Sequence, residues 1–216
     1  GVRHRFRVVL AHMSEPIKLT AELTARSGTH YRPETRLIHS GTLRSQFGET
    51  SEALFLTQGY VYDSSAQAEA RFKNEDPGYQ YSRFANPTVT MFERRIAEFE
   101  GAEAARATAT GMAAVSSTLL SLLKQGDRVV SIRDSYGGTN VLFEEFLPRY
   151  GIAVTLCETT DFDAIEAQIA AGCAMVYLET PTNPTLKVVD IGRLCAAARN
   201  AGAVSVTDNT FATPVN

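Results

Sequence analysis

The second half of the chain alternates short apolar runs with longer amphipathic stretches. The apolar runs predict β-strands at residues 104–109, 128–132, 152–156, 174–178 and 203–207. The stretches between them place apolar residues at helical spacing and predict helices at residues 111–124, 139–149, 161–171 and 190–201. Strands that alternate with helices are typical of a parallel sheet with helices on its faces. We therefore predict that residues 101–216 form the first part of an α/β domain.

The first half of the chain lacks this alternation. Residues 29–57 are polar, with scattered Gly and Pro, and predict an extended arm with short turns. A short helix is predicted at residues 65–73, and strong turn residues follow at 74–78. Residues 13–100 are therefore predicted to form an arm and short helices that precede the α/β domain.

Pro87 predicts the start of a further helix in this half. Proline is favoured at the first helical position, and Asn86 before it is a good N-cap. Four apolar residues then recur at helical spacing: Val89, Phe92, Ile96 and Phe99.

Composition narrows the class of protein. Hydrophobic residues make up 44% of the 216 residues and charged residues 21%, which is ordinary for a soluble globular protein. The net charge of -3 and the lack of a basic run argue against a nucleic-acid or acidic-membrane partner. No apolar stretch approaches the roughly 18–20 residues that span a bilayer. The three cysteines are far apart and predict reduced thiols in the cytoplasm and no metal site.

Residues 1–12 combine three arginines with a very short apolar run. They allow two interpretations: a targeting leader, or an extension that precedes a natural start at Met13. The apolar run is too short for a signal peptide, so we favour the extension. These residues are left out of the fold prediction.

The segment 108–114 follows the first predicted strand and opens a helix at Gly111. A helix N-terminus presents unpaired N–H groups and partial positive charge, and glycine lets an anion approach closely. The segment is therefore a candidate phosphate-binding turn. A plain glycine-containing connection between strand and helix is the alternative.

Three more predicted strands are followed by or end in residues that could bind a ligand. Tyr136, followed by two glycines, could lie flat on a planar ligand, Asn183 is held between prolines, and Asp208 ends an apolar strand. Each also has a structural alternative, namely a surface tyrosine, a rigid connector and a turn cap. Ligands bind beyond the carboxyl ends of parallel strands, so these groups should share one rim. A planar aromatic cation that carries a phosphate would use all of them.

These segments carry a family resemblance. The chain resembles the Cys/Met-metabolism family of pyridoxal 5'-phosphate (PLP) enzymes from about Thr35 to its last residue. The matching segments, in order, are residues 81–83 with 86–88, 110–114, 136–139, 179–184 and 208–210. The resemblance implies a PLP fold-type-I, aminotransferase-like large domain, a parallel-rich sheet flanked by helices, preceded by an extended N-terminal arm.

The resemblance also implies residue roles. Gly111 and Met112 would donate backbone N–H groups to the PLP phosphate. Tyr136 would stack on the pyridine ring and help move protons, and Asn183 would lie near its phenolic oxygen. Asp208 would pair with the protonated ring nitrogen and keep the ring an electron sink.

Three further residues receive roles in the same way. Thr210 would line the cofactor pocket. Tyr81 and Arg83 would reach across a dimer interface to the phosphate of the neighbouring subunit, a task that suits the planar guanidinium fork. A solvated surface charge is the structural alternative for Arg83. The resemblance thus implies a dimer with shared sites, paired into a tetramer, with residues 13–100 at the dimer interface.

Within the family, segments 60–68 and 76–83 are most similar to the O-succinylhomoserine sulfhydrylases. This resemblance implies a small amino-acid substrate whose γ-succinyl group is replaced by sulfide, which gives homocysteine for methionine biosynthesis. Cystathionine γ-synthase, cystathionine γ-lyase and methionine γ-lyase share the same core segments and remain alternatives.

The lysine that bonds to the cofactor follows the Asp-Asn-Thr segment in this family, and the sequence stops at Asn216 before that point. None of its four lysines, Lys18, Lys73, Lys124 and Lys187, is assigned that role. We therefore expect the chain to be one piece of a longer enzyme, inactive by itself because covalent catalysis needs the amine. A non-catalytic fragment or assembly partner is the alternative of another class. Without the family's later strands, the strand at residues 104–109 should lack a sheet partner.

Overall fold

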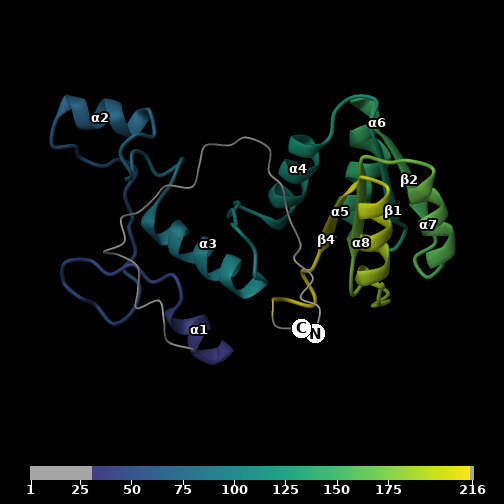
Figure 1. The fold of residues 1–216 in the computed structure, drawn as a ribbon, viewed down its shortest axis with the longest axis horizontal. Helices are drawn as coiled ribbons and strands as arrows, with labels where there is room; N and C mark the ends of the chain where they lie inside the picture. The colour runs from purple at the N-terminus through teal and green to yellow at the C-terminus, as the bar shows by residue number, and fades with distance from the viewer. Residues whose placement is uncertain (1–30, 215–216) are drawn as a thin grey trace. The chain divides into compact units, whose positions relative to one another are not determined.

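The computed structural model describes residues 31–214, and these form two compact units (Figure 1). The described part of the first unit runs from Tyr31 to Ala107, and that of the second from Thr108 to Pro214. Residues 1–12 and Met13, on which the leader question depends, lie outside the described residues, as does Lys18.

The second unit contains a four-stranded parallel sheet with the strand order β2-β1-β3-β4. The strands are β1 (Arg128–Ile132), β2 (Ala153–Cys157), β3 (Met175–Glu179) and β4 (Val204–Asp208). All four lie within one residue of their predicted positions. Their apolar composition predicts them well because strands of a parallel sheet are covered on both faces.

Helices connect the strands and cover the two faces of the sheet (Figure 1). They are α4 (Gly111–Leu122), α5 (Gly137–Val141), α6 (Leu147–Arg149), α7 (Phe162–Ala170) and α8 (Ile191–Asn200), with the π-helical turn η2 (Leu142–Phe146) between α5 and α6. Side chains cap three of them: Thr110 accepts from Ala113 N, Asp161 from Ala164 N and Asp190 from Arg193 N. These caps confirm the helix starts predicted near 161 and 190 and show the physical reason for them.

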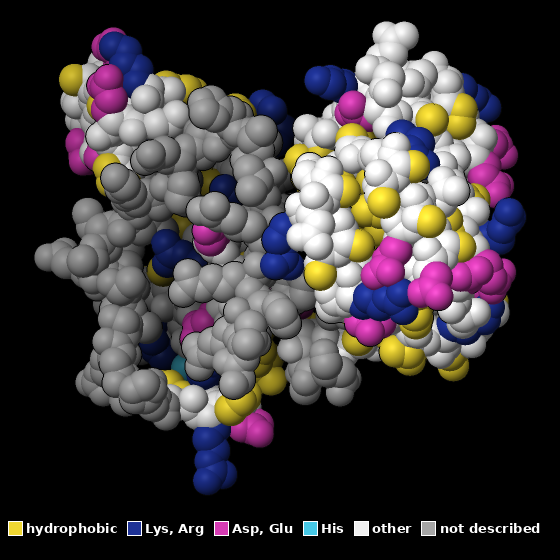
Figure 2. All heavy atoms as spheres, turned by 45° about the vertical axis from the view of Figure 1, so that its right-hand side comes forward, with side chains coloured by type: hydrophobic (Ala, Val, Ile, Leu, Met, Phe, Trp, Pro, Cys, Tyr) yellow, Lys and Arg dark blue, Asp and Glu magenta, His cyan; other side chains and the backbone are white. Residues whose placement is uncertain are grey.

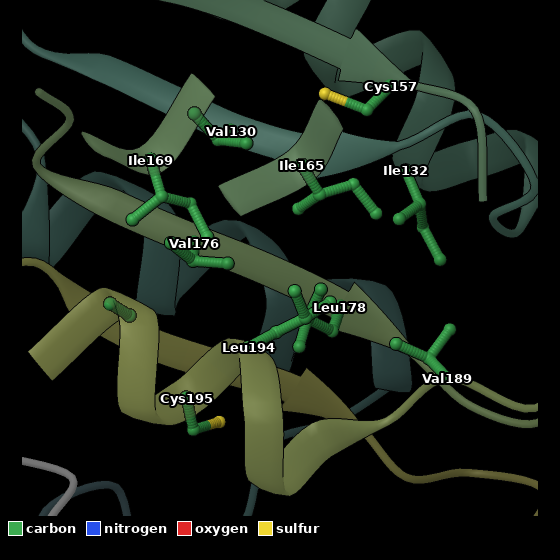
Figure 3. Packing of buried hydrophobic residues seen from close by; sticks show 11 residues of the cluster. Val130, Ile132, Cys157, Ile165, Ile169, Val176, Leu178, Val189, Leu194 and Cys195 are labelled. Carbon is green, nitrogen blue, oxygen red and sulfur yellow. The ribbon is translucent and has the colours of Figure 1, made fainter. Parts of the chain in front are cut away.

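The hydrophobic core of this unit has one part on each face of the sheet. Figure 3 shows the part in which Val176 and Leu178 of β3 meet Ile165 of α7 and Leu194 of α8. The other part contains Tyr177, the β3 residue between them, whose ring packs edge-on against Phe143 at 5.2 Å. Successive β3 side chains therefore serve opposite faces, as the two-residue period of a strand requires.

The strand predicted at residues 104–109 is wrong. These residues adopt no regular secondary structure, and the segment is divided between the two units. A strand is stabilised by hydrogen bonds to a neighbouring strand, and no described residue supplies them here. This result agrees with the expectation that the segment lacks a sheet partner.

The first unit contains three helices among its described residues: α1 (Pro33–His39), α2 (Ser65–Phe72) and α3 (Pro87–Glu100). The predicted caps are present on α3, where Asn86 accepts from Thr88 N and Pro87 takes the first position. The extended arm predicted for residues 29–57 is only partly correct, because α1 interrupts it. Its seven residues make too little of a periodic pattern to detect.

No described helix is long and apolar enough to cross a membrane. On the face shown in Figure 2, basic and acidic side chains lie interspersed over the second unit.

Candidate cofactor site

The loops after β1, β3 and β4 leave the sheet at the same edge because these strands are parallel and adjacent. Tyr136 lies in the first loop and Asn183 in the second, while Asp208 is the last residue of β4. Glu179, the last residue of β3, is the register partner of Asp208. The sheet thus brings the predicted ring, amide and carboxylate to one rim.

Glu179 connects two of these loops directly. Its Oε2 accepts a hydrogen bond from Tyr136 N at 2.8 Å, and its Oε1 accepts one from Asn183 N at 2.7 Å. The residue is only 5% exposed. Burial raises the pKa of the Glu179 carboxyl, and the two N–H donors oppose that rise. One buried side chain therefore fixes the backbone beside both predicted cofactor residues.

The half-buried carboxylate of Asp208 is also held by its neighbours. Its Oδ1 accepts from the Thr210 hydroxyl at 2.6 Å and from Thr210 N at 3.1 Å. Its Oδ2 accepts from the Tyr177 hydroxyl at 3.4 Å. Burial raises the pKa of Tyr177, so this hydroxyl stays protonated as a donor. The turn cap considered for Asp208 is therefore present, and it coexists with a fixed orientation of the carboxylate at the rim.

Tyr136 lies against the first turn of α5 and against α4. A methyl group at position 138 would come within 2.7 Å of the Tyr136 ring at Cε1 and within 3.2 Å of Met112 Sδ. Gly138 therefore lets the ring and the Met112 side chain approach each other closely. About half of the surface of Tyr136 is exposed, so the residue is accessible to a ligand.

The N-terminus of α4 fits a phosphate group. Thr110 Oγ1 accepts from Ala113 N at 3.0 Å, and Thr110 O accepts from Ala114 N at 3.1 Å. Within the described chain, the N–H groups of Gly111 and Met112 make no hydrogen bond, as is usual for the first helical turn. A side chain at Gly111 would meet no atom within 4 Å, so the protein itself gives no steric reason for glycine there. A bound anion would give one.

The loop that carries Asn183 is rigid. Thr182 is fully buried, and its hydroxyl accepts from Lys187 N at 2.9 Å. Thr180 Oγ1 accepts from Val189 N at 3.0 Å, which ties the start of the loop to its end. The Asn183 side chain is half-buried and hydrogen-bonds to no other residue in the described part of the chain. The backbone at Asn183 is therefore held in place, and its side-chain amide has capacity for a ligand.

Lys187 has a structural role. Its Nζ lies 2.8 Å from Asp134 Oδ2 and 3.3 Å from Glu158 Oε1, which joins the loops after β1, β2 and β3. Lys187 lowers the pKa of Asp134, and the Asp134 carboxylate in turn raises the pKa of Lys187. These ion pairs hold the Lys187 ammonium group between two carboxylates.

Tyr81 and Arg83 belong to the first unit, so the fold does not place them relative to this rim. Tyr81 pairs with Gly59 in an isolated antiparallel bridge, and its hydroxyl donates to Gln58 Oε1 at 3.2 Å. The Arg83 guanidinium lies 4.7 Å from the centre of the Phe84 ring and 5.7 Å from that of Tyr81. No described carboxylate forms an ion pair with it.

Sequence reasoning gave no role to Tyr177 or to Glu179. In the sequence, Glu179 only begins the matching segment 179–184, and Tyr177 indicates no more than a residue of an apolar strand. Residues 177, 179 and, through the register, 208 lie on the same face of the sheet. That alternation was the available signal, but it becomes informative only once the neighbouring strand is known.

With this geometry in place, comparison with known proteins identifies the family. The family model described as "Cys/Met metabolism PLP-dependent enzyme" matches residues 34–216. The chain belongs to this family. Its cofactor is PLP, as the sequence indicated. The residues present fit that group: a helix N-terminus with N–H groups that are unpartnered within the described chain, a half-exposed aromatic ring and an oriented carboxylate.

Individual relatives agree. The chain is 46% identical over 178 residues to O-succinylhomoserine sulfhydrylase of Mycobacterium tuberculosis, with 82% of this chain and 44% of that protein covered. It is 43% identical over 181 residues to L-methionine gamma-lyase of Fusobacterium nucleatum, with 83% and 46% covered. The chain thus spans about half the length of the curated relatives it matches.

Solved structures show the same fold. The structure of metB from Corynebacterium glutamicum matches with a TM-score of 0.78 and 30% identity, covering 86% of this chain and 46% of that one. A putative O-acetylhomoserine (thiol)-lyase from Campylobacter jejuni matches with a TM-score of 0.79 and 31% identity, covering 85% and 46%. The second structure contains a lysine covalently modified by PLP. The predicted fold class is therefore confirmed.

Proposed function

We propose that this chain is the first part of a PLP enzyme that replaces the γ-succinyl group of O-succinylhomoserine with sulfide, which releases succinate and forms homocysteine. The observation that carries the cofactor assignment is the shared rim, where Glu179 links the Tyr136 and Asn183 loops beside Asp208. The substrate assignment is supported by 46% and 42% identity to sulfhydrylases of Mycobacterium tuberculosis and Pseudomonas aeruginosa.

In this proposal, bound PLP supplies an electron sink for the substrate carbon next to the amine. Gly111 and Met112 donate their N–H groups to the phosphate at the start of α4, where the helix dipole favours an anion. Asp208 offers a carboxylate to the protonated ring nitrogen, in an orientation that Thr210 and Tyr177 maintain. Thr210 also lines the pocket.

Two residues act on the faces and edge of the ring. Tyr136, about half exposed, stacks on the ring, and its hydroxyl holds or moves a proton near the substrate. Asn183 offers its amide to the phenolic oxygen of PLP. Because the loop that carries Asn183 is already held by hydrogen bonds, this contact costs little backbone conformational entropy.

The first unit serves the neighbouring subunit in this proposal. Tyr81 and Arg83 bind the phosphate of a partner's cofactor, so the enzyme is a homodimer with shared sites, paired into a tetramer. An arginine that contacts only aromatic rings within the described chain keeps its guanidinium fork available for phosphate. We infer a cytoplasmic location, where the three free cysteines remain reduced.

Methionine γ-lyase is the second candidate, because identity to the Fusobacterium nucleatum enzyme, 43%, nearly equals that to the sulfhydrylases. Cystathionine γ-synthase and γ-lyase would use the same rim. A non-catalytic assembly partner is the candidate of another class.

The test is to express the full-length protein that contains this chain and load it with PLP. A visible absorbance band and homocysteine formation from O-succinylhomoserine and sulfide are the expected results. Faster release of methanethiol from methionine would replace the sulfhydrylase assignment with the lyase. A protein that binds no PLP would contradict both and favour the non-catalytic role.

A further inference from the structure

Glu179 differs from every other acidic residue at the rim in how its charge is compensated. Asp134 and Glu158 pair with Lys187, and Asp208 accepts from a hydroxyl and a backbone group of its own turn. Glu179 has no Lys or Arg partner among the described residues. Instead, each carboxylate oxygen accepts from the backbone of a different loop.

Burial of the Glu179 carboxylate costs free energy unless both of its hydrogen bonds, to Tyr136 N and to Asn183 N, are made. Burying a carboxylate removes its hydration, and the register places Asp208, another carboxylate, directly beside it. A hydrocarbon side chain would avoid this cost but could not accept from the two N–H groups. The site therefore favours glutamate for its two acceptors and its reach, since Tyr136 and Asn183 lie four residues beyond the ends of β1 and β3 respectively.

We propose that Glu179 is a positioning residue that sets the Tyr136 ring and the Asn183 amide in place before the cofactor binds. The expected consequence, tight PLP binding, rests on the proposed function. The link that Glu179 makes between the two loops does not depend on that function. Glu179 lies beside the residues that contact the ring, and it acts through the backbone of their loops.

Glutamine at position 179 separates this role from packing alone. The two side chains have nearly the same size, but the amide has one oxygen and one NH2 group. Because both present partners are N–H donors, one of them would face another donor in Glu179→Gln. A residue that only fills space would tolerate this change.

The matched control is Glu144→Gln. Glu144 is exposed on η2, and its substitution removes the same unit of charge away from the rim. Both variants are made in the full-length protein and measured first without cofactor. The readout is backbone hydrogen exchange in peptides that cover residues 133–140 and 180–187, followed by the PLP dissociation constant.

Loss of one buried hydrogen bond corresponds to roughly tenfold in an equilibrium. In Glu179→Gln we expect amide exchange at Tyr136 or Asn183 to accelerate by about that factor, and PLP affinity to fall by about tenfold or more. Glu144→Gln should match the parent protein in both. If Glu179→Gln does not fold, Glu179→Asp keeps the charge and both acceptors with shorter reach, and the same exchange should accelerate there.

Unchanged exchange at both amides would overturn the proposal. Faster exchange with unchanged PLP affinity would overturn the positioning role and leave only a loop contact. A parent protein that binds no PLP, while Glu179→Gln still accelerates exchange, would refute the proposed function and retain the loop linkage. The two failures are therefore distinguishable.

Discussion

The two units differ in how they bury their apolar residues. In the second unit, both faces of β3 are buried and hydrophobic clusters cover each face of the sheet. In the described part of the first unit, the buried apolar residues are Leu43, Pro87 and Met91. Large apolar side chains are exposed there instead, among them Phe47, Leu54, Leu56, Val61 and Phe92.

This difference shows which parts of the proposed site depend on local structure. The rim residues of the second unit are fixed by sheet register, helix caps and buried hydrogen bonds within that unit. Tyr81 and Arg83 lie on a unit with little core of its own, where exposed apolar surface is typical of an interaction site. The comparison predicts that the second unit supplies the chemistry of one subunit and that the first unit acts on another.

The largest effect should come from Asp208→Ala in the full-length enzyme. Loss of an electrostatic contact in a preorganised site costs about 10²–10³-fold in turnover, and the fold should remain intact.

Arg83→Ala should weaken PLP binding by about 10–100-fold, which corresponds to the loss of a charged hydrogen bond.

Mixing the two variants sharpens the comparison. If Arg83 acts on the neighbouring subunit, a mixed dimer of Asp208→Ala and Arg83→Ala subunits contains one intact site. Random mixing should then restore about a quarter of the parent activity, because a two-fold dimer has equivalent sites. Activity that stays at the level of the separate variants would show that Arg83 serves its own subunit or neither.

The next effect concerns stability. Leu178 is fully buried in the second unit and Leu56 is 94% exposed in the first. Leu178→Ala should lower the free energy of unfolding by about 2–5 kcal/mol, whereas Leu56→Ala should change it by less than about 0.5 kcal/mol. Urea denaturation measures both. Equal losses would show that Leu56 is buried in the assembled protein and would remove the contrast between the units.

A smaller effect should follow from Gly138→Ala. The added methyl group would collide with the Tyr136 ring and push it from its position beside Met112. Displacement of a reacting group by about 1 Å can cost up to about 10²-fold in kcat. Gly137→Ala is the matched control, because a methyl group there meets no atom within 4 Å. Equal activity in the two variants would argue against a precise placement of Tyr136.

The smallest effect is pH-dependent. Lys187 and Thr159 lower the pKa of Asp134 below its ordinary value of 3.8. The stability that this carboxylate contributes is therefore present above that value and is lost as the pH falls through the lowered pKa. Asp134→Asn should be less stable than the parent near pH 7, and the difference in melting temperature should vanish in strong acid. A difference that persists unchanged in acid would mean that charge is not responsible.

Much of the second unit was predictable because its signals are local. Apolar runs gave β1 to β4, and the caps at Asp161 and Asp190 gave the starts of α7 and α8. The failure at residues 104–109 has a non-local cause, since an apolar segment becomes a strand only when a neighbour supplies its hydrogen bonds. In the first unit, α1 was not predicted, because a helix of seven residues shows little periodicity in its apolar positions.

The sequence by itself determined the family, the cofactor and the order of the segments at the rim, because these depend on residue identity and spacing. Only the tertiary structure showed that Glu179 joins the Tyr136 and Asn183 loops and that Tyr177 contacts Asp208. The Glu179–Tyr136 and Tyr177–Asp208 contacts join residues 43 and 31 positions apart. They exist because parallel strands bring distant residues into register, which no local pattern in the chain specifies.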